Sequence, residues 1–410
     1  AKGIREGNPK ADSLAIDYAV MEAKEKGLEA EGKVLHALKL ITMVNTRLGL
    51  FYKPYPDFVH WRSGKVHSTH RQCHANTRRA SSAEPNMQQL STKEKIEGYE
   101  PRIRAVVQPH TAEAVIVAMD FNAQELRLMA DDSQDPNMVA CYVGDKKKDM
   151  HGITGSMIAL KQSAMFKKKV DEVADSYENY DDAVYYTFVG MAKSDDPAEV
   201  KIYKDFRDLG KKVNFTALYG AQAEKLGATL MVSEEDAQVF LDARAEAFRV
   251  SEKWKTQYLV AKAKEDGFVR SKLGAKRHLA EMFDSFDRSI SSKAERQAAN
   301  FRIQGSAAEM TKLAEGRIWR EGLTERFDAK IVGPIHDEVV ASVAVKDLPQ
   351  FIKEMHACMV KPYADMKIEI KSSIEFGPNM QDLIEIGMEP ADEAIAEGIA
   401  ELKETYPQYA

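Results

Sequence analysis

Three separated stretches of the 410-residue sequence combine residue types that can act on a charged substrate. The first ends in Asp120, which follows the apolar, β-branched run at residues 114–118. This run predicts a buried strand with Asp120 at its tip. An ionised carboxylate is costly in that position unless something pairs with it, so we expect a divalent metal ion or an arginine beside it.

The second stretch is the triplet His336-Asp337-Glu338, far downstream of Asp120. It stands between two apolar segments, residues 330–335 and 339–343, which predict the arms of a hairpin. Taken singly, each aspartate could be structural, one a buried Asp and the other an Asp in a tight turn. Taken together, two strand-end carboxylates favour a shared metal site, because oxygen atoms are the ligands that Mg²⁺ prefers.

The third stretch places Arg207, Lys211, Phe215 and Tyr219 four residues apart. On a helix this spacing puts all four on one broad face, and Gly220 can end the helix. The alternative is an ordinary amphipathic helix with two long basic side chains at its edge. Such a face suits a core poorly, so we predict a strip that binds phosphates at one end and stacks on a flat ring at the other.

The elements that must position these stretches begin with helices and a basic platform. Residues 13–48 have helical composition and could form half of a helical hairpin. Residues 51–89 are rich in Pro, Gly, His and Ser, with a predicted hairpin at 62–67. Five Lys and Arg residues and four histidines lie between 58 and 83 without a single acid, which predicts a basic surface.

Further helices are predicted from Gln124 onward, from Asp149 to Lys169, and over residues 233–266, where Ser233 can cap the first turn. Residues 268–278 are typical of a basic hairpin.

Residues 292–315 have helical composition, with three long polar side chains four apart on one face. This face suits a nucleic-acid backbone or groove, and a solvated helix surface is the alternative. The three residues are Arg296, Asn300 and Gln304.

Two segments are strongly acidic. Residues 171–199 are also rich in tyrosine, and we expect a solvated insertion with some helix. Residues 382–404 are predicted to form an acidic C-terminal tail.

Composition limits the class of protein. A chain of this length is expected to form two or three subdomains, and 44% apolar with 30% charged residues fits a globular protein. No apolar run has the length that a bilayer requires, and the first residues lack the apolar core of a secretory signal. Three widely spaced cysteines fit neither a disulfide framework nor a zinc site, so a cytoplasmic location is expected.

Taken in order, these pieces resemble the polymerase domain of family A DNA polymerases, the DNA polymerase I class, and favour a bacteriophage member. Residues 120–127 (DFNAQELR) are similar to the first family signature, 207–220 to the second, and His336-Asp337-Glu338 to the third. Residues 79–88, 149–151, 267–270 and 296–306 match in the same order.

The resemblance implies an α+β, right-hand fold with an antiparallel-sheet palm, helical fingers and a partial helical thumb. The expected boundaries are 1–50 for the partial thumb, 51–145 for the first part of the palm with its basic platform, 146–280 for the fingers with an acidic insertion at 170–200, and 281–410 for the rest of the palm with the tail.

The resemblance also implies that Asp120 and Asp337 bind two Mg²⁺ ions, with the Phe121 carbonyl as a further ligand and Glu338 nearby. Two metal ions about 4 Å apart can activate a primer 3′ hydroxyl and stabilise the leaving pyrophosphate. Two aspartates suffice, because Mg²⁺ is commonly bound by one or two carboxylates and substrate phosphates.

For the incoming deoxynucleotide, the resemblance implies phosphate contacts from Arg207, Lys211 and His151, with Lys211 also placed to protonate pyrophosphate. A second set would surround the base and sugar: Phe215 packs against them, Tyr219 sits where the template base enters, and Glu125 excludes a ribose 2′ hydroxyl. This set is Phe215, Tyr219, Glu125 and its neighbour Gln124.

For the primer-template duplex, Arg79 and His336 would contact the minor groove, whose acceptors occur on every base pair. The other residues implied to bind DNA are Arg270, Arg296, Asn300 and Gln304.

Members of the family usually carry an exonuclease domain and two long thumb helices before the polymerase. Here we expect either a fragment or a split polymerase, in which a second polypeptide supplies the exonuclease and the rest of the thumb, and we favour the split. We also expect the acidic insertion to contact another replication protein or to decorate the fingers. The alternative functions are a single-subunit RNA polymerase, a catalytically weak DNA-binding subunit and a two-metal nuclease.

Overall fold

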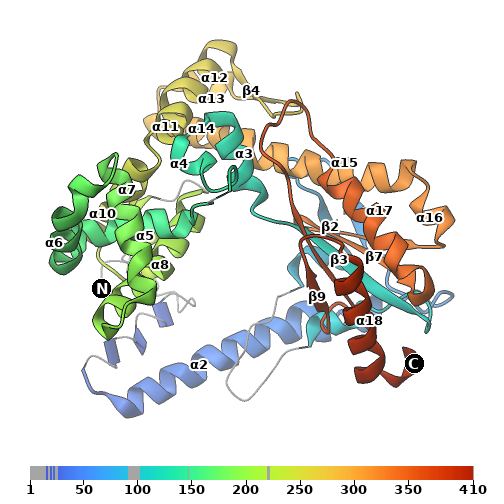
Figure 1. Ribbon diagram of the computed structural model, residues 1–410. Coiled ribbons are helices and arrows are strands. Elements are labelled where there is room, and N and C mark those ends of the chain that lie inside the picture. The colour runs from blue at the N-terminus through green and yellow to red at the C-terminus, as the bar shows by residue number, and fades with distance from the viewer. Residues whose placement is uncertain are drawn as a thin grey trace.

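The structure is a computed structural model in which a strand layer and a helical layer face each other, with α2 (Glu29–Arg47) extending along the lower edge (Figure 1). It describes residues 15–16, 19–20, 22–23, 26–90, 102–145, 147–218 and 222–409. No helix within these ranges is both long and apolar enough to cross a bilayer.

The strand layer is a five-stranded antiparallel sheet in the order β6-β7-β3-β8-β9. Its central strand, β3 (Ala114–Phe121), contains the predicted apolar run, whose residues are buried. A strand covered on both faces needs apolar residues at successive positions, and this run provides them. The other strands are β6 (Lys330–Ile335), β7 (Glu338–Ala344), β8 (Ser372–Gly377) and β9 (Ile384–Gly387).

Alternate residues of β3 point into two different cores. Val115, Val117 and Met119 belong to the main core, together with residues of α15 (Ser306–Arg320) and α17 (Leu348–Val360). Ile116 and Ala118 belong to a smaller core on the other face, which includes residues of the basic platform. Asp120 has the same parity as this second set, and it therefore ends the strand on the face away from α15 and α17.

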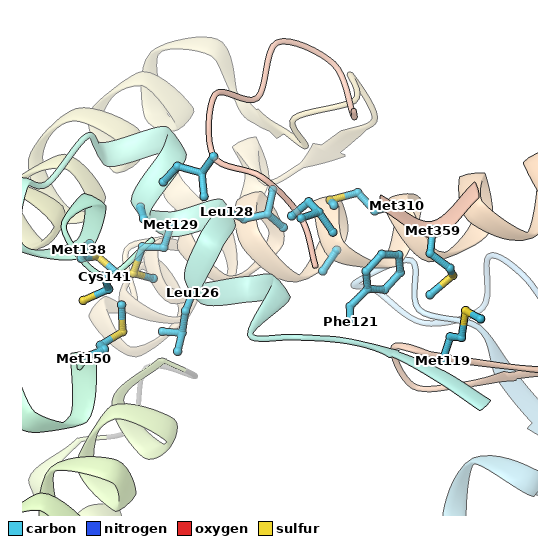
Figure 2. Close-up of a cluster of buried hydrophobic side chains, with 14 of the residues drawn as sticks. Met119, Phe121, Leu126, Leu128, Met129, Met138, Cys141, Met150, Met310 and Met359 are labelled. Atoms are coloured by element: carbon cyan, nitrogen blue, oxygen red, sulfur yellow. The ribbon is translucent and has the colours of Figure 1, made fainter. Parts of the chain in front are cut away.

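The main core continues from the sheet into the helical layer through α3 (Gln124–Ser133). Figure 2 shows Met119 and Phe121 near Met310 and Met359, with Leu126 and Met129 lying toward Met138 and Met150. Nearly every side chain of α3 is buried, including charged ones. This helix thus fixes the end of β3 relative to the helical layer.

An ion cluster anchors the far end of α3. The Lys272 ammonium lies 2.6 Å from an Asp131 oxygen and 3.0 Å from an Asp132 oxygen, and all three side chains are buried. The Arg302 guanidinium lies 2.5 Å from Asp132. Buried charges are stable only when paired in this way, so the cluster ties the hairpin of β4 (Phe268–Arg270) and β5 (Lys276–His278) to α3.

The helical layer contains α5 (Met150–Gln162), α6 (Ala164–Val173), α7 (Tyr180–Gly190), α8 (Pro197–Leu218), α9 (Ala223–Leu230) and α10 (Glu234–Ala247). The predicted Ser233 cap is confirmed, because its hydroxyl accepts from the Asp236 N–H. The single helix predicted from Asp149 to Lys169 is two helices. Ser163 leaves the helical conformation and caps α6 by accepting from the Phe166 N–H.

The prediction of a solvated acidic insertion is wrong for α7. Ala183, Val184 and Phe188 of this helix belong to the main core, and the Tyr185 hydroxyl accepts from the Asp149 N–H at 2.7 Å. The two acids of α7, Asp181 and Asp182, lie in its first turn and form ion pairs with Arg249 and Lys148. The high charge of the whole segment concealed a helix that is mostly apolar after its first turn.

The predicted acidic tail is also folded. It forms β9 and α18 (Asp392–Thr405), whose Ile395 and Leu402 are buried in the main core. Beyond α18, the Tyr409 hydroxyl donates to the Ala114 carbonyl at 3.0 Å, at the start of the central strand.

The basic platform consists of short elements. The predicted hairpin at 62–67 is a turn closed by a single bridge between Val59 and Val66. The elements before β3 are η1 (Leu48–Tyr52), η2 (Tyr55–Phe58), β1 (Thr69–Arg71), β2 (Ser81–Ala83), η3 (Met87–Gln89) and η4 (Ile103–Val106).

A long helical run connects the top of the molecule to the sheet (Figure 1). It consists of α14 (Arg288–Asn300), the π-helical η8 (Phe301–Gly305) and α15. The remaining elements are α4 (Pro136–Val139), η5 (Ala174–Ser176), η6 (Met191–Lys193), α11 (Arg249–Lys253), η7 (Trp254–Leu259), α12 (Val260–Asp266), α13 (Ala280–Phe283), α16 (Leu323–Arg326), η9 (Val345–Asp347) and η10 (Pro407–Tyr409).

Candidate active site

The carboxylates predicted to act together meet at one end of the sheet. Asp120 pairs across the ladder with Glu338 on β7 and with Ser373 on β8. Asp337 occupies the turn just before β7, and its carbonyl accepts from the Phe121 N–H at 3.4 Å. Asp120 lies more than 200 residues from these partners in sequence, and they are neighbours because β3 lies between β7 and β8.

Crowding of these acids changes their protonation. The Asp120 side chain keeps an exposed edge, but the surrounding protein and then the Asp337, Glu338 and Glu375 charges raise its pKa to about 7. Burial likewise raises the pKa of Glu338 to about 7, against the opposing charge of Arg104. The cluster holds more negative charge than the protein neutralises, and a divalent cation would relieve this excess.

Sequence reasoning missed two members of this cluster. Glu375 on β8 pairs with Ala118 and points to the same face as Asp120, and its charge raises the pKa of Asp120 and of Glu338. Arg104 in η4 lies 3.7 Å from Glu338. Neither residue stands in a distinctive local sequence pattern. The pairing of β8 with β3 brings Glu375 to the cluster, and the packing of the second core brings Arg104.

Gln88 holds the hairpin turn from outside. Its amide oxygen accepts from the His336 N–H at 2.7 Å, and its amide nitrogen donates to the Pro334 carbonyl. His336 is exposed and has a φ of 61°, which L-residues rarely adopt. The two hydrogen bonds give a physical reason for the stability of this conformation.

Glu125 lies at the start of α3 and is buried. Its carboxylate accepts from the Arg79 guanidinium at 2.5 Å. Burial raises the pKa of Glu125, and Arg79 opposes the rise. The second carboxylate oxygen has no hydrogen-bond partner among the described residues.

A narrow crevice separates α3, α15 and the hairpin turn. Gln124 is 2% exposed at its edge, and its amide donates to the Ala307 carbonyl at 3.3 Å. Its side chain is thus directed toward α15. The crevice is lined by Arg79, Ala80, Gln124, Ala307, Ala308, Thr311, Lys312, Pro334, His336 and Asp337.

The predicted face of α8 is present as far as the structure describes it. Arg207 donates to Asp149, the N-cap of α5, at 2.6 Å. The rings of His151 and Phe215 have centroids 5.6 Å apart, and Lys211 is exposed between Arg207 and Phe215. Tyr219 and Gly220 lie outside the described residues.

Four of the residues predicted to contact DNA lie along the run from β4 to η8. Arg270 and Arg296 are exposed, whereas Asn300 and Gln304 are half-buried. The π-helical turn of η8 begins directly after Asn300. Gln304 therefore lies in the π-helical segment, whereas Arg296 and Asn300 lie on the preceding α-helix.

An antiparallel sheet that carries carboxylates at one strand end and faces a layer of helices defines the right-hand polymerase class of fold. The model of the family described as DNA polymerase family A matches residues 12–382, so the chain belongs to this family.

Relatives and a solved structure support the assignment. The chain is 26% identical over 334 residues to the thermostable DNA polymerase I of Thermus aquaticus, covering 81% of this chain and 34% of the relative. It is 26% identical to DNA polymerase I of Bacillus subtilis, covering 82% and 32%. The chain therefore spans about a third of the length of these curated relatives.

The structure is similar to the POL domain of Pol1 from M. smegmatis in complex with DNA primer-template and dNTP. The TM-score is 0.67 at 22% identity, and the match covers 92% of this chain and 57% of that chain. The comparison shows that the two share a fold.

Proposed function

We propose that the chain is a template-directed DNA polymerase that adds deoxynucleotides to a primer 3′ hydroxyl in DNA replication. The observation that carries this proposal is the meeting of Asp120 with the Asp337 turn, in a fold whose α8 presents Arg207, Lys211 and Phe215 on one face. Phosphate-binding cations and strand-end acids are the two parts that nucleotidyl transfer requires.

Asp120, Asp337 and the Phe121 carbonyl would hold two Mg²⁺ ions. Among the described residues no three His, Cys, Asp or Glu side chains form a ready-made metal site. Mg²⁺ nevertheless fits, because it takes few carboxylates and completes its shell with water and substrate phosphates. When bound, Mg²⁺ supplies activation of the primer hydroxyl and stabilisation of charge on the phosphates.

The chain's own residues would bind and orient the nucleotide. Arg207, Lys211 and His151 would donate to the triphosphate, and Lys211 would give a proton to the departing pyrophosphate. Phe215 would pack against the base and sugar, and Tyr219 would lie where the template base enters. The buried Glu125 carboxylate, held by Arg79, would fill the space that a ribose 2′ hydroxyl needs.

The duplex would lie against the exposed polar residues between the sheet and the helices. Minor-groove contacts would come from Arg79 and His336, because acceptors there are common to every base pair. The other proposed contacts are Arg270, Arg296, Asn300 and Gln304. We also propose the division expected from the sequence, with palm segments at 51–145 and 281–410 and fingers at 146–280.

We further propose that α2 belongs to a thumb completed by a second polypeptide, which also supplies the exonuclease. The support is an apolar stripe on α2, in which Val34 is 60% exposed, Leu38 47% and Ile41 55%. Their spacing of four and three residues is the spacing that packs one helix against another.

Changing Leu38 and Ile41 to Glu should remove binding of the co-expressed partner, and Lys33→Glu, on the exposed surface of the same helix, should not. If the double variant binds like the wild type, this proposal fails. The origin of the chain from a bacteriophage and its cytoplasmic location stay predictions; the three free cysteines support the latter.

A primer-extension assay tests the main proposal. The chain with Mg²⁺, a primer-template and dNTPs should extend the primer, and rNTPs should support little extension. Efficient use of rNTPs would favour the single-subunit RNA polymerase instead. DNA binding without extension would favour the catalytically weak subunit, and cleavage without extension would favour the nuclease.

A further inference from the structure

Asn214 is a fully buried amide beneath the proposed nucleotide-binding face. It lies on α8, three residues after Lys211, and its side chain has four hydrogen-bond partners. Three of these partners lie in the first half of α5 and the fourth lies on α10. They are Met150, His151, Thr154 and Arg244.

The orientation of this amide follows from the chemistry of its partners. Arg244 Nε lies 3.2 Å from Asn214 Oδ1, and an arginine can only donate. The Met150 carbonyl lies 3.3 Å from Asn214 Nδ2, and a carbonyl can only accept. Both contacts require the oxygen to face α10 and the amide nitrogen to face the start of α5, so the usual ambiguity of an asparagine is removed.

The same amide nitrogen lies 3.2 Å from Nδ1 of His151. Because this nitrogen donates, Nδ1 must accept and therefore carries no proton. A neutral imidazole with an unprotonated Nδ1 has its proton on Nε2. We propose that Asn214 is a positioning residue that holds His151 as the neutral Nε2–H tautomer, so that His151 presents a hydrogen-bond donor to the triphosphate of the incoming nucleotide.

The surroundings of His151 agree with a neutral ring. Burial lowers the pKa of His151, and the nearby Arg207 and Lys211 charges on α8 lower it further, against Asp149 at the cap of α5. Arg207 and Lys211 would already supply positive charge to the triphosphate. A neutral donor adds a directed hydrogen bond at that place without a third cation beside them.

The network reaches beyond α8 in a way that fixes Asn214. Arg244 is 3% exposed, and its Nη1 donates to the Glu252 carboxylate at 2.6 Å. The Thr154 hydroxyl donates to the same Asn214 oxygen at 2.9 Å. Since both donors hold the oxygen, the amide cannot rotate without losing two hydrogen bonds in a buried place, which is strongly unfavourable.

The ligand, the triphosphate of a nucleotide, rests on the proposed function, whereas the tautomer of His151 does not. The first test therefore needs no polymerase activity. In the full chain labelled with ¹⁵N-histidine, NMR spectra at pH 7.5 should show His151 as the Nε2–H tautomer, assigned by loss of the signal in His151→Gln. A His151 signal from the Nδ1–H tautomer or the imidazolium would overturn the proposal.

The second test changes the donor. Asn214→Asp keeps the size of the side chain but offers a carboxylate oxygen to Nδ1, so Nδ1 should become protonated. At a pH where the ring stays neutral, Nε2 then carries no proton to donate to the triphosphate. Primer extension should then show a KM for dNTP raised by about tenfold with a much smaller change in kcat.

Thr154→Val is the matched control, because it removes a hydrogen bond to the same amide without touching His151. It should leave the tautomer unchanged. An Asn214→Asp variant that keeps the wild-type tautomer would refute the proposal even if the polymerase assay succeeds. A failed polymerase assay with the expected tautomer would refute only the proposed function.

Discussion

Gly155 of α5 and Gly210 of α8 bring the two helices into backbone contact. A β-carbon on Gly210 would lie 2.5 Å from the His151 carbonyl oxygen and 2.7 Å from the Gly155 nitrogen. These distances are shorter than any ordinary contact with carbon. The close approach is what allows His151 on one helix to meet Phe215 on the other.

Gly210→Ala should therefore destabilise the protein, although alanine is normally the better helix residue by about 1 kcal/mol. We expect a loss of about 1–3 kcal/mol, because the atoms that must move are backbone atoms. Chemical denaturation measures the difference. Gly190→Ala, at the open end of α7, is the control and should be neutral or stabilising; equal behaviour of the two variants would contradict the close packing.

Asp120→Asn and Asp337→Asn should each reduce primer extension by at least about a thousandfold, because each removes a charge that the proposed metal site needs. Duplex binding should persist or strengthen, since a negative charge near DNA is lost. Extension assays and binding titrations at one salt concentration measure both. Asp347→Asn, beyond the opposite end of β7, should leave both unchanged; extension by either active-site variant at wild-type rates would refute the metal assignment.

Glu125→Ala should raise incorporation of ribonucleotides relative to deoxynucleotides by roughly tenfold to a hundredfold, because it removes the buried group proposed to exclude a 2′ hydroxyl. The ratio of kcat/KM for rNTP and dNTP measures this selectivity. The neighbouring pair of Arg78 and Glu309, 3.3 Å apart, provides the control. Glu309→Gln should leave the ratio unaltered, and an unaltered ratio in Glu125→Ala would remove the proposed role of Glu125.

Local pattern predicted much of this structure. The apolar run before Asp120, the arms around the His336 turn and the cap at Ser233 are determined by neighbouring residues, and all three elements formed. The four-residue spacing correctly placed Arg207 and Phe215 on one helix face.

What the sequence did not predict depends on contacts between distant residues. Glu375 joins Asp120 only because β8 pairs with β3, and nothing near Glu375 indicates that pairing. In α7 the count of acids concealed the apolar residues Ala183, Val184 and Phe188, which could have been recognised as one buried side of a helix. The role of Asn214 could not be predicted from its neighbours in sequence, since its hydrogen-bond partners lie on two other helices.

The fold of α7 changes the expected effect of removing the acidic segment. Deleting residues 171–199 should expose the main core and destabilise or unfold the protein, because Phe188 and Met191 are almost completely buried. Thermal unfolding and expression of folded protein measure this effect. Neutralising the exposed acids Glu172 and Glu178 with Gln should change stability little. A deletion variant as stable as the wild type would contradict the placement of α7 in the core.

Glu315 on α15 gives a pH-dependent prediction that is independent of catalysis. Burial raises its pKa from 4.5 to about 7, with Lys312 opposing. The folded state therefore holds this proton more tightly than the unfolded state. The resulting stabilisation is complete below about pH 4.5 and is lost as the pH rises through about 7.

Glu315→Gln should match the wild type near pH 5 and exceed its free energy of unfolding by about 2 kcal/mol at pH 8, because glutamine has no charge to bury. Denaturant titrations across this range measure the difference. The pH dependence that Asp120 and Glu338 contribute is the same in both proteins and cancels in this difference. Glu397→Gln, on the exposed side of α18, should show no such trend. A constant difference between Glu315→Gln and the wild type from pH 5 to pH 8 would show that Glu315 is ionised throughout this range and that its burial does not shift its pKa.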